Sequence, residues 1–183
     1  CWLGNTNLIL SIIKLIEDKM NLEHDIREGG VQMILLVEDS IRFYSSILPN
    51  LYNFLLVQSK SFSKEALNRH SATMRMRGRP KVVLARTYEE AITLYNRYKD
   101  NTLGVISDAR FPLTPVANPS PKAEDKDPEA GLKLLRTIRA QDEYVPLILE
   151  SAETENRTKA EAEGFRYVDK NSKTMNRDLR RLM

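Results

Sequence analysis

The chain has 183 residues, of which 42% are hydrophobic and 29% are charged, and its formal net charge at neutral pH is +3. This composition is typical of one soluble domain with extensions, and the small net charge gives no strong attraction to nucleic acid or to a membrane. Cys1 is the single cysteine, which excludes an internal disulfide and offers no zinc cluster, so we expect a reducing, cytoplasmic setting. The first residue, which is not Met, and the abrupt charged end favour a piece of a longer protein.

Residues 5–28 predict one amphipathic helix, which Gly29 and Gly30 end. Its apolar residues form two neighbouring rows: Leu8, Ile12, Leu15, Leu22 and Ile26, and then Ile9, Ile13, Ile16 and Met20. Two interpretations stay open, namely a helix that packs on its own domain or on a neighbour, and a coiled-coil linker that forms a homodimer or transmits a signal. We therefore divide the chain into an N-terminal linker helix, residues 1–30, and a domain over residues 31–183.

Short apolar runs that alternate with helical patterns fill the rest of the chain. We predict strands at residues 33–37, 81–85, 103–107, 145–149 and 165–168. We predict helices from residue 40 until Pro49 disturbs it, over residues 88–99, 132–139 and 155–163, and from about residue 174 to the end. This alternation is typical of a parallel sheet covered on both faces, so the expected fold is α/β, flavodoxin-like and doubly wound, with an extra N-terminal helix.

Two segments are longer than such a fold needs. Residues 112–130 contain five of the eight prolines and are expected to form a mobile, solvated loop. Residues 57–80 are basic, and around Arg75, Arg77 and Arg79 they could bind nucleic acid or instead face solvent or a protein partner. We favour the second interpretation, because no nucleic-acid recognition motif accompanies the charge.

Polar side chains stand at the carboxyl ends of four predicted strands. Glu38 and Asp39 follow the first strand, Asp108 the third, Ser151 the fourth and Lys170 the fifth. Each could by itself be a helix-start, turn, cap or surface residue. Because ligands bind beyond the carboxyl ends of parallel strands, we expect all five to meet at one edge of the sheet.

This set of side chains predicts phosphoryl chemistry. Packed carboxylates repel one another, and Mg²⁺ with its preference for oxygen ligands would relieve that repulsion. Asp108 is then the expected nucleophile that becomes an aspartyl phosphate, and Lys170 and Ser151 can contact phosphate oxygens. A phosphohydrolase with an Asp nucleophile is disfavoured, because the position two residues after Asp108, where such enzymes carry a general acid, is Arg110.

Four segments resemble the receiver domains of two-component response regulators: residues 34–39, 106–112, 148–152 and 167–170. The resemblance implies Mg²⁺ binding by Glu38, Asp39, Asp108 and the backbone carbonyl of Arg110. It also implies a phosphoryl acceptor at Asp108, partner groups for the phosphoryl group at Ser151 and Lys170, and a switch aromatic at Tyr167.

The resemblance also implies a role. The chain would be a bacterial phosphorelay module, and not an enzyme beyond its own phosphorylation and dephosphorylation. A histidine kinase or phosphotransfer protein would donate the phosphoryl group, and a downstream protein or fused effector domain would read the changed surface. No direct contact with nucleic acid or a membrane is expected.

The sequence departs from the receiver pattern in several places. Asn171 stands where the family usually has proline, and Gly131 comes about 15 residues later than the glycine expected after the acceptor. The extensions resemble receiver-like regions of larger bacterial proteins, including phosphoenolpyruvate synthase-like proteins. The alternative function is therefore a pseudo-receiver, which would act as a regulatory or protein-interaction domain without phosphorylation.

Overall fold

The described residues of the chain form one parallel β-sheet. The computed structural model describes residues 6–64, 78–118 and 121–172. Its strands are β1 (Met33–Val37), β2 (Lys81–Ala85), β3 (Thr102–Asp108), β4 (Leu147–Ser151) and β5 (Arg166–Asp169). They lie in the order β2-β1-β3-β4-β5 and every pair is parallel. This order is that of the flavodoxin-like doubly wound fold, which confirms the predicted fold class.

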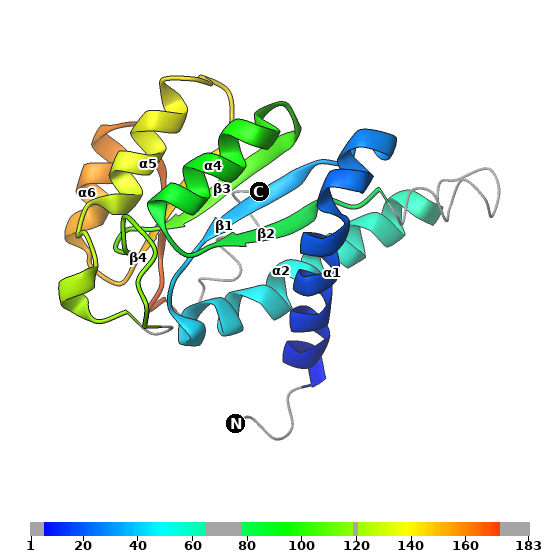
Figure 1. The fold of residues 1–183 in the computed structure, drawn as a ribbon, viewed down its shortest axis with the longest axis horizontal. Coiled ribbons are helices and arrows are strands. Elements are labelled where there is room, and N and C mark those ends of the chain that lie inside the picture. The colour runs from blue at the N-terminus through cyan, green and yellow to red at the C-terminus, as the bar shows by residue number, and fades with distance from the viewer. Residues whose placement is uncertain (1–5, 65–77, 119–120, 173–183) are drawn as a thin grey trace.

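Helices cover both faces of the sheet (Figure 1). On one face lie α4 (Tyr88–Tyr98), α5 (Ala130–Arg139) and α6 (Glu155–Ala162), and on the other lies α2 (Ile41–Lys64). Two short 3₁₀ helices, η1 (Lys99–Asn101) and η2 (Ala123–Asp125), lie in the connections. Because β1 is packed on both faces, all five of its residues are buried, as its unbroken apolar sequence predicts.

The helix after β1 is longer than predicted. We expected Pro49 to disturb it, but α2 continues through Pro49 to Lys64, so that expectation was wrong. A proline inside a helix costs about 3 kcal/mol. Burial of an apolar row offsets this cost: Ile47, Leu48, Leu51, Tyr52 and Leu55 all pack on the sheet. The first part of the basic segment at residues 57–80 is thus a continuation of a helix.

The other element boundaries agree with the sequence within about two residues. β4 begins and ends two residues later than predicted, and it therefore includes Glu150 and Ser151. The expected final helix from residue 174 lies outside the described residues, as do Arg75 and Arg77. Among the described helices, none has the length and apolar character that a membrane crossing requires.

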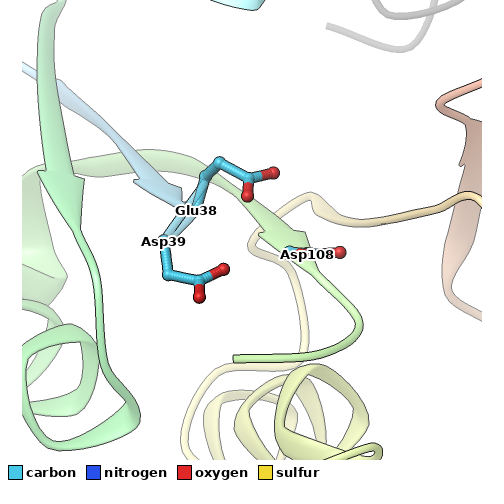
Figure 2. Close-up of side chains that lie close together, drawn as sticks. All are labelled: Glu38, Asp39 and Asp108. Carbon is cyan, nitrogen blue, oxygen red and sulfur yellow. The ribbon is translucent and has the colours of Figure 1, made fainter. Parts of the chain in front are cut away.

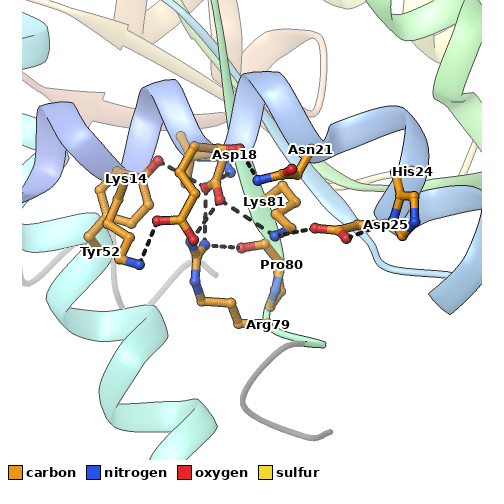
Figure 3. Close-up of polar contacts among 11 residues, drawn as sticks. Lys14, Asp18, Asn21, His24, Asp25, Tyr52, Arg79, Pro80 and Lys81 are labelled. Atoms are coloured by element: carbon orange, nitrogen blue, oxygen red, sulfur yellow. Dashed lines mark hydrogen bonds and ion pairs between the residues drawn. The ribbon is translucent and has the colours of Figure 1, made fainter.

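The predicted N-terminal helix is α1 (Thr6–Gly29), and it packs on the domain that follows it. Figure 3 shows Asp18 of α1 at the centre of a polar cluster between α1, α2 and β2. The Asp18 side chain is fully buried and accepts hydrogen bonds from both terminal nitrogens of Arg79, from the Tyr52 hydroxyl and from the Val82 backbone N–H, at 2.7 to 3.0 Å. This cluster attaches α1 to the edge strand of the sheet.

Arg79 therefore has a role that the sequence did not suggest. We placed it in a basic surface segment, but its side chain is only 6% exposed and pairs with Asp18. A second ion pair joins the two elements nearby, where the Lys81 ammonium lies 2.6 Å from the Asp25 carboxylate. Arg79 is thus unavailable to nucleic acid or a protein partner. Its charge compensates an acid of the N-terminal helix.

We predict that Asp18→Asn lowers the free energy of unfolding by about 3 kcal/mol, because it leaves the Arg79 guanidinium buried without a compensating charge. Equilibrium unfolding in urea would measure the difference. The matched control is Glu17→Gln, which breaks only the exposed pair with Lys14 and should cost less than about 1 kcal/mol. Equal effects of the two substitutions would contradict the role assigned to Asp18.

Candidate functional site

Three carboxylates meet at the carboxyl ends of β1 and β3 (Figure 2). Glu38 and Asp39 directly follow β1, and Asp108 is the last residue of β3. One oxygen atom from each lies within 4.8 Å of the others. Glu38 and Asp39 are at most 1% exposed, so this is an acidic cluster inside the protein. The parallel strand order brings these residues together, as the sequence predicted.

Lys170 joins the same cluster from the end of β5. Its Nζ lies 2.9 Å from Asp108 Oδ1 and also contacts Glu38 Oε2, so one ammonium group bridges two carboxylates. The ring of Phe43, in the first turn of α2, has its centre 4.4 Å from the same Nζ. Asp108 Oδ1 also accepts a hydrogen bond from the Ala109 backbone N–H at 2.7 Å. The Asp108 carboxylate is therefore held in a fixed orientation.

The acidic cluster has the chemical character of a site for a hard cation. Among the described residues, the buried Oδ1 atom of Asp39 has no hydrogen-bond partner. An unpaired buried carboxylate oxygen is costly unless a cation or a hydrogen-bond donor compensates it. The three carboxylates supply only oxygen ligands, which Mg²⁺ prefers. Glu38, Asp39 and Asp108 thus fit the metal that the sequence led us to expect.

A second ammonium group contacts the cluster from the proline-rich loop, residues 112–130. Lys126 Nζ lies 2.7 Å from Asp39 Oδ2, and its side chain is only 18% exposed. An antiparallel β-bridge between Phe111 and Asp127 holds the loop in place. The backbone N–H groups of Tyr88 and Glu89 also donate hydrogen bonds to the backbone carbonyls of residues 112 and 113. No sequence pattern points to Lys126, because its contact with Asp39 depends on how the loop returns to the sheet.

Glu150 is a further acidic residue that we had not assigned to the site. It is 1% exposed, and its Oε1 has no hydrogen-bond partner among the described residues. Side chains alternate along a strand, and Glu150 pairs in register with Asp108, so both point to the same face as Ile106 and Ile148. This alternation was readable in the sequence and could have identified Glu150 as a neighbour of Asp108.

Burial and mutual repulsion change the ionisation of the cluster. Burial, with a further contribution from the Asp108 charge, raises the pKa of Glu38 to about 7 against the opposing effect of Lys170. Burial also raises the pKa of Glu150 to about 8 and raises the pKa of Asp108. Burial alone would lower the pKa of Lys170, but the three surrounding acids raise it, so the ammonium stays charged. Four carboxyl groups therefore share two ammonium groups, which favours an additional cation.

Ser151, the last residue of β4, and Tyr167 of β5 lie on neighbouring strands. The Ser151 hydroxyl oxygen accepts hydrogen bonds from the Glu153 backbone N–H and the Asn156 amide, at 3.0 and 2.9 Å. The Tyr167 hydroxyl lies 3.1 Å from the Ser151 carbonyl oxygen. The same carbonyl accepts the Lys170 backbone N–H, so these residues of β4 and β5 form one connected unit.

The connection after β3 returns to Asp108 at Gly131. A Cβ atom at this position would lie 2.1 Å from the Asp108 carbonyl oxygen, so only glycine fits there. The late glycine of the sequence thus packs against the end of β3 in spite of the long connection. The Arg110 side chain points toward Glu153, at 3.7 Å, and the metal contact predicted for its backbone carbonyl stays a prediction.

Comparison with solved structures identifies the fold. A crystal structure described as a response regulator receiver domain protein from Clostridium thermocellum aligns with a TM-score of 0.50 and 18% sequence identity, over 83% of this chain and 90% of that chain. The chain has the receiver-domain fold. The non-phosphorylated HemR receiver domain from Leptospira biflexa aligns with a TM-score of 0.48 and 18% identity, over 82% of this chain and 93% of its own. No protein-family model and no curated protein sequence matches the chain.

Lys126 competes with any cation for Asp39, so we predict that Lys126→Met raises the affinity for Mg²⁺ by about tenfold. Isothermal titration of the protein with MgCl₂ would measure the affinity. The matched control is Lys122→Met in the same loop, which removes only an exposed pair with Glu124 and should leave the affinity unchanged. Weaker binding by the Lys126 variant would show that this lysine supports the site instead of competing for it.

Glu150 should make the metal-free protein less stable as the pH rises. Its folded pKa of about 8 lies above the ordinary value of 4.5, so the unfolded chain loses this proton first, and stability falls between those two pH values. We predict that the Glu150→Gln variant matches wild type in free energy of unfolding near pH 4.5 and is more stable than wild type at pH 8, by on the order of 4 kcal/mol.

Urea unfolding in EDTA across this pH range is the measurement. Glu153→Gln serves as the control, because its side chain is 62% exposed. If the free energy of unfolding changes with pH in the same way for wild type and for Glu150→Gln, the result would contradict the expected burial of a neutral carboxyl group.

Proposed function

We propose that the chain is a phosphorelay receiver module that accepts a phosphoryl group on Asp108 in a Mg²⁺-dependent reaction and thereby switches a protein-binding surface. One observation carries the proposal. The Asp108 carboxylate, at the end of β3, lies within 4.8 Å of two buried acids and 2.9 Å from a buried ammonium group. Two neighbouring carboxylates that can hold a metal ion, and an ammonium group that can bind a phosphoryl oxygen, are what a phosphoryl acceptor of this kind requires.

The transfer would proceed at the Asp108 carboxylate. Lys170 and the Ala109 N–H hold Oδ1, so Oδ2 is the oxygen that attacks phosphorus. A bond forms between Oδ2 and phosphorus, and the bond from phosphorus to the donor, an imidazole nitrogen of a kinase or phosphotransfer protein, breaks. Bound Mg²⁺ would neutralise charge on the carboxylates and on the transferred group. Lys170 would then contact a phosphoryl oxygen with the same ammonium that now holds Asp108.

Ser151 and Tyr167 are the proposed readout. Both acceptor positions of the Ser151 hydroxyl are used by Glu153 and Asn156, so its O–H is the group that can donate to a phosphoryl oxygen. A shift of Ser151 would move its backbone carbonyl, which Tyr167 contacts. The ring of Tyr167 stacks against Arg157 of α6, so the change would reach the surface formed by α6 and β5. A downstream protein or fused effector domain would bind there.

A second candidate function is the pseudo-receiver, a domain that binds proteins without being phosphorylated. Lys126 is the observation that favours it, because this lysine already occupies a carboxylate oxygen of the acidic cluster. Lys170 bridges the other two acids, Glu38 and Asp108. A cluster held by two ammonium groups can be stable without a metal ion. The two candidates therefore differ in whether the cluster binds Mg²⁺ and whether Asp108 becomes modified.

We predict that acetyl phosphate with Mg²⁺ adds one phosphoryl group to the wild-type protein, as measured by intact mass. The gain should be absent with Asp108→Asn and absent in EDTA, because the nucleophile or its neutralising cation is missing. Asp100→Asn is the control, since this exposed residue lies in η1, just before the start of β3 and thus at the opposite end of that strand from Asp108, and this variant should be phosphorylated like wild type.

Two results would count against phosphorylation at Asp108. A folded wild-type protein that gains no mass from acetyl phosphate or phosphoramidate would favour the pseudo-receiver. A mass gain that survives in Asp108→Asn would place the acceptor elsewhere.

A further inference from the structure

Exposed apolar side chains are concentrated on the N-terminal helix. Among the described residues, eleven large apolar side chains are exposed, and six of these belong to the first four turns of α1: Ile9, Leu10, Ile12, Ile13, Ile16 and Met20. Single exposed apolar residues are normal, but a contiguous patch usually marks a contact surface. This patch does not belong to the acidic cluster, and its role is independent of the proposed phosphorylation.

The helix has two faces with different surroundings. Ser11, Asp18 and Leu22 are buried against the domain, and they define the inner face. Ile13 and Met20 each lie two residues after one member of this inner row, which corresponds to about 200° around the helix. They are 54% and 79% exposed. Ile13 and Met20 therefore lie on the side of α1 opposite its inner face, whereas Leu10, at the border of the patch, lines a pocket with residues of α2.

The contacts of the inner face fix the orientation of α1 and therefore of its exposed outer face. Asp18 and Asp25 attach α1 to Arg79 and Lys81 at the start of β2, and Leu22 enters the core. In Figure 1 the N-terminal turns of α1 extend past α2, away from the sheet. A helix that is fixed in this way presents its outer face without a further loss of conformational entropy on binding.

We propose that the outer face of α1 binds the same face of a second copy of this chain, so that the protein is a dimer. Ile9, Ile13, Ile16 and Met20 follow one another at spacings of four, three and four residues, which is the spacing of the seam of a coiled coil. No charged residue interrupts this seam. A two-fold symmetric contact needs a surface that is complementary to itself, and an uncharged row with coiled-coil spacing meets that requirement.

The size of the patch is sufficient for a specific contact. Six large side chains at about half exposure amount to roughly 600 Å² on each copy, and Leu10 and Ile12 widen the seam on its two sides. A standard specific interface buries about 800 Å² per partner, so the seam and its polar borders approach this value. A chain with such a patch would be expected to associate instead of leaving it in water.

The proposed contact leaves the signalling surface free. α1 packs on β2, at one edge of the sheet, while β5 forms the opposite edge. The surface of α6 and β5, where we place the readout, is therefore at the far side of the sheet from the seam. Each copy of the dimer could be phosphorylated and could bind its own partner.

Sedimentation equilibrium of the full chain tests the proposal, in reducing buffer so that Cys1 forms no intermolecular disulfide. Wild type should be a dimer in the micromolar range, and Ile13→Glu/Ile16→Glu should raise the dimer dissociation constant by roughly 100-fold or more, because charges would face each other across the seam. The control variant Val57→Glu/Leu113→Glu removes two other exposed apolar residues and should sediment like wild type.

The folding of each variant is checked by far-ultraviolet circular dichroism and by the urea midpoint at a concentration at which wild type is monomeric. Ile13→Leu/Ile16→Leu, which keeps the seam apolar, should remain a dimer. A monomeric wild type over the tested range would overturn the proposal and leave the face to a different partner. A folded Ile13→Glu/Ile16→Glu variant that stays dimeric would also overturn it, because the contact would then lie elsewhere.

Discussion

The repulsion between buried acids at the carboxyl edge of the sheet is the constraint on which the functional site depends. Glu38, Asp108 and Glu150 extend the apolar rows of three parallel strands, so the topology forces them together on one face. Lys170 lowers the cost of this arrangement but cannot remove it, because burial and mutual repulsion still hold the pKa of Glu38 near 7 and that of Glu150 near 8. Because these buried carboxylates repel one another, their ionisation depends strongly on a nearby cation and on the charge of Asp108.

The rest of the domain brings these groups together and keeps water out. Packed strands and α2 bury the acids, and Gly131 lets the long connection after β3 return to the end of that strand. The same connection supplies Lys126, a positive charge that the core elements do not provide. The proline-rich loop is therefore part of the electrostatics of the site. Lys126 is also the feature that separates the two proposed functions, since it can either change the affinity of the site for a cation or take the place of that cation.

A second buried charge cluster has a purely structural purpose. Asp18 and Arg79 are 61 residues apart in sequence, and their pairing fastens α1 to the edge strand β2. An edge strand that is covered cannot pair with another chain through its backbone, so α1 also protects the sheet. The helix thereby gains a defined orientation, with Ser11, Asp18 and Leu22 on its buried face and an apolar row on its exposed face. The two interpretations of this helix that the sequence left open, packing on its own domain and pairing with another copy, become compatible.

The sequence by itself determined the strands, most of the helices and the row of polar residues at the strand ends, because burial and periodicity are local properties of the chain. Only the tertiary structure decided that α2 continues through Pro49, since burial of its apolar row offsets the cost of the proline. Only the tertiary structure placed Lys126 beside Asp39 and Arg79 inside the protein. Each of these contacts joins segments far apart in the chain, and no local pattern records which distant charge a loop or a helix will meet.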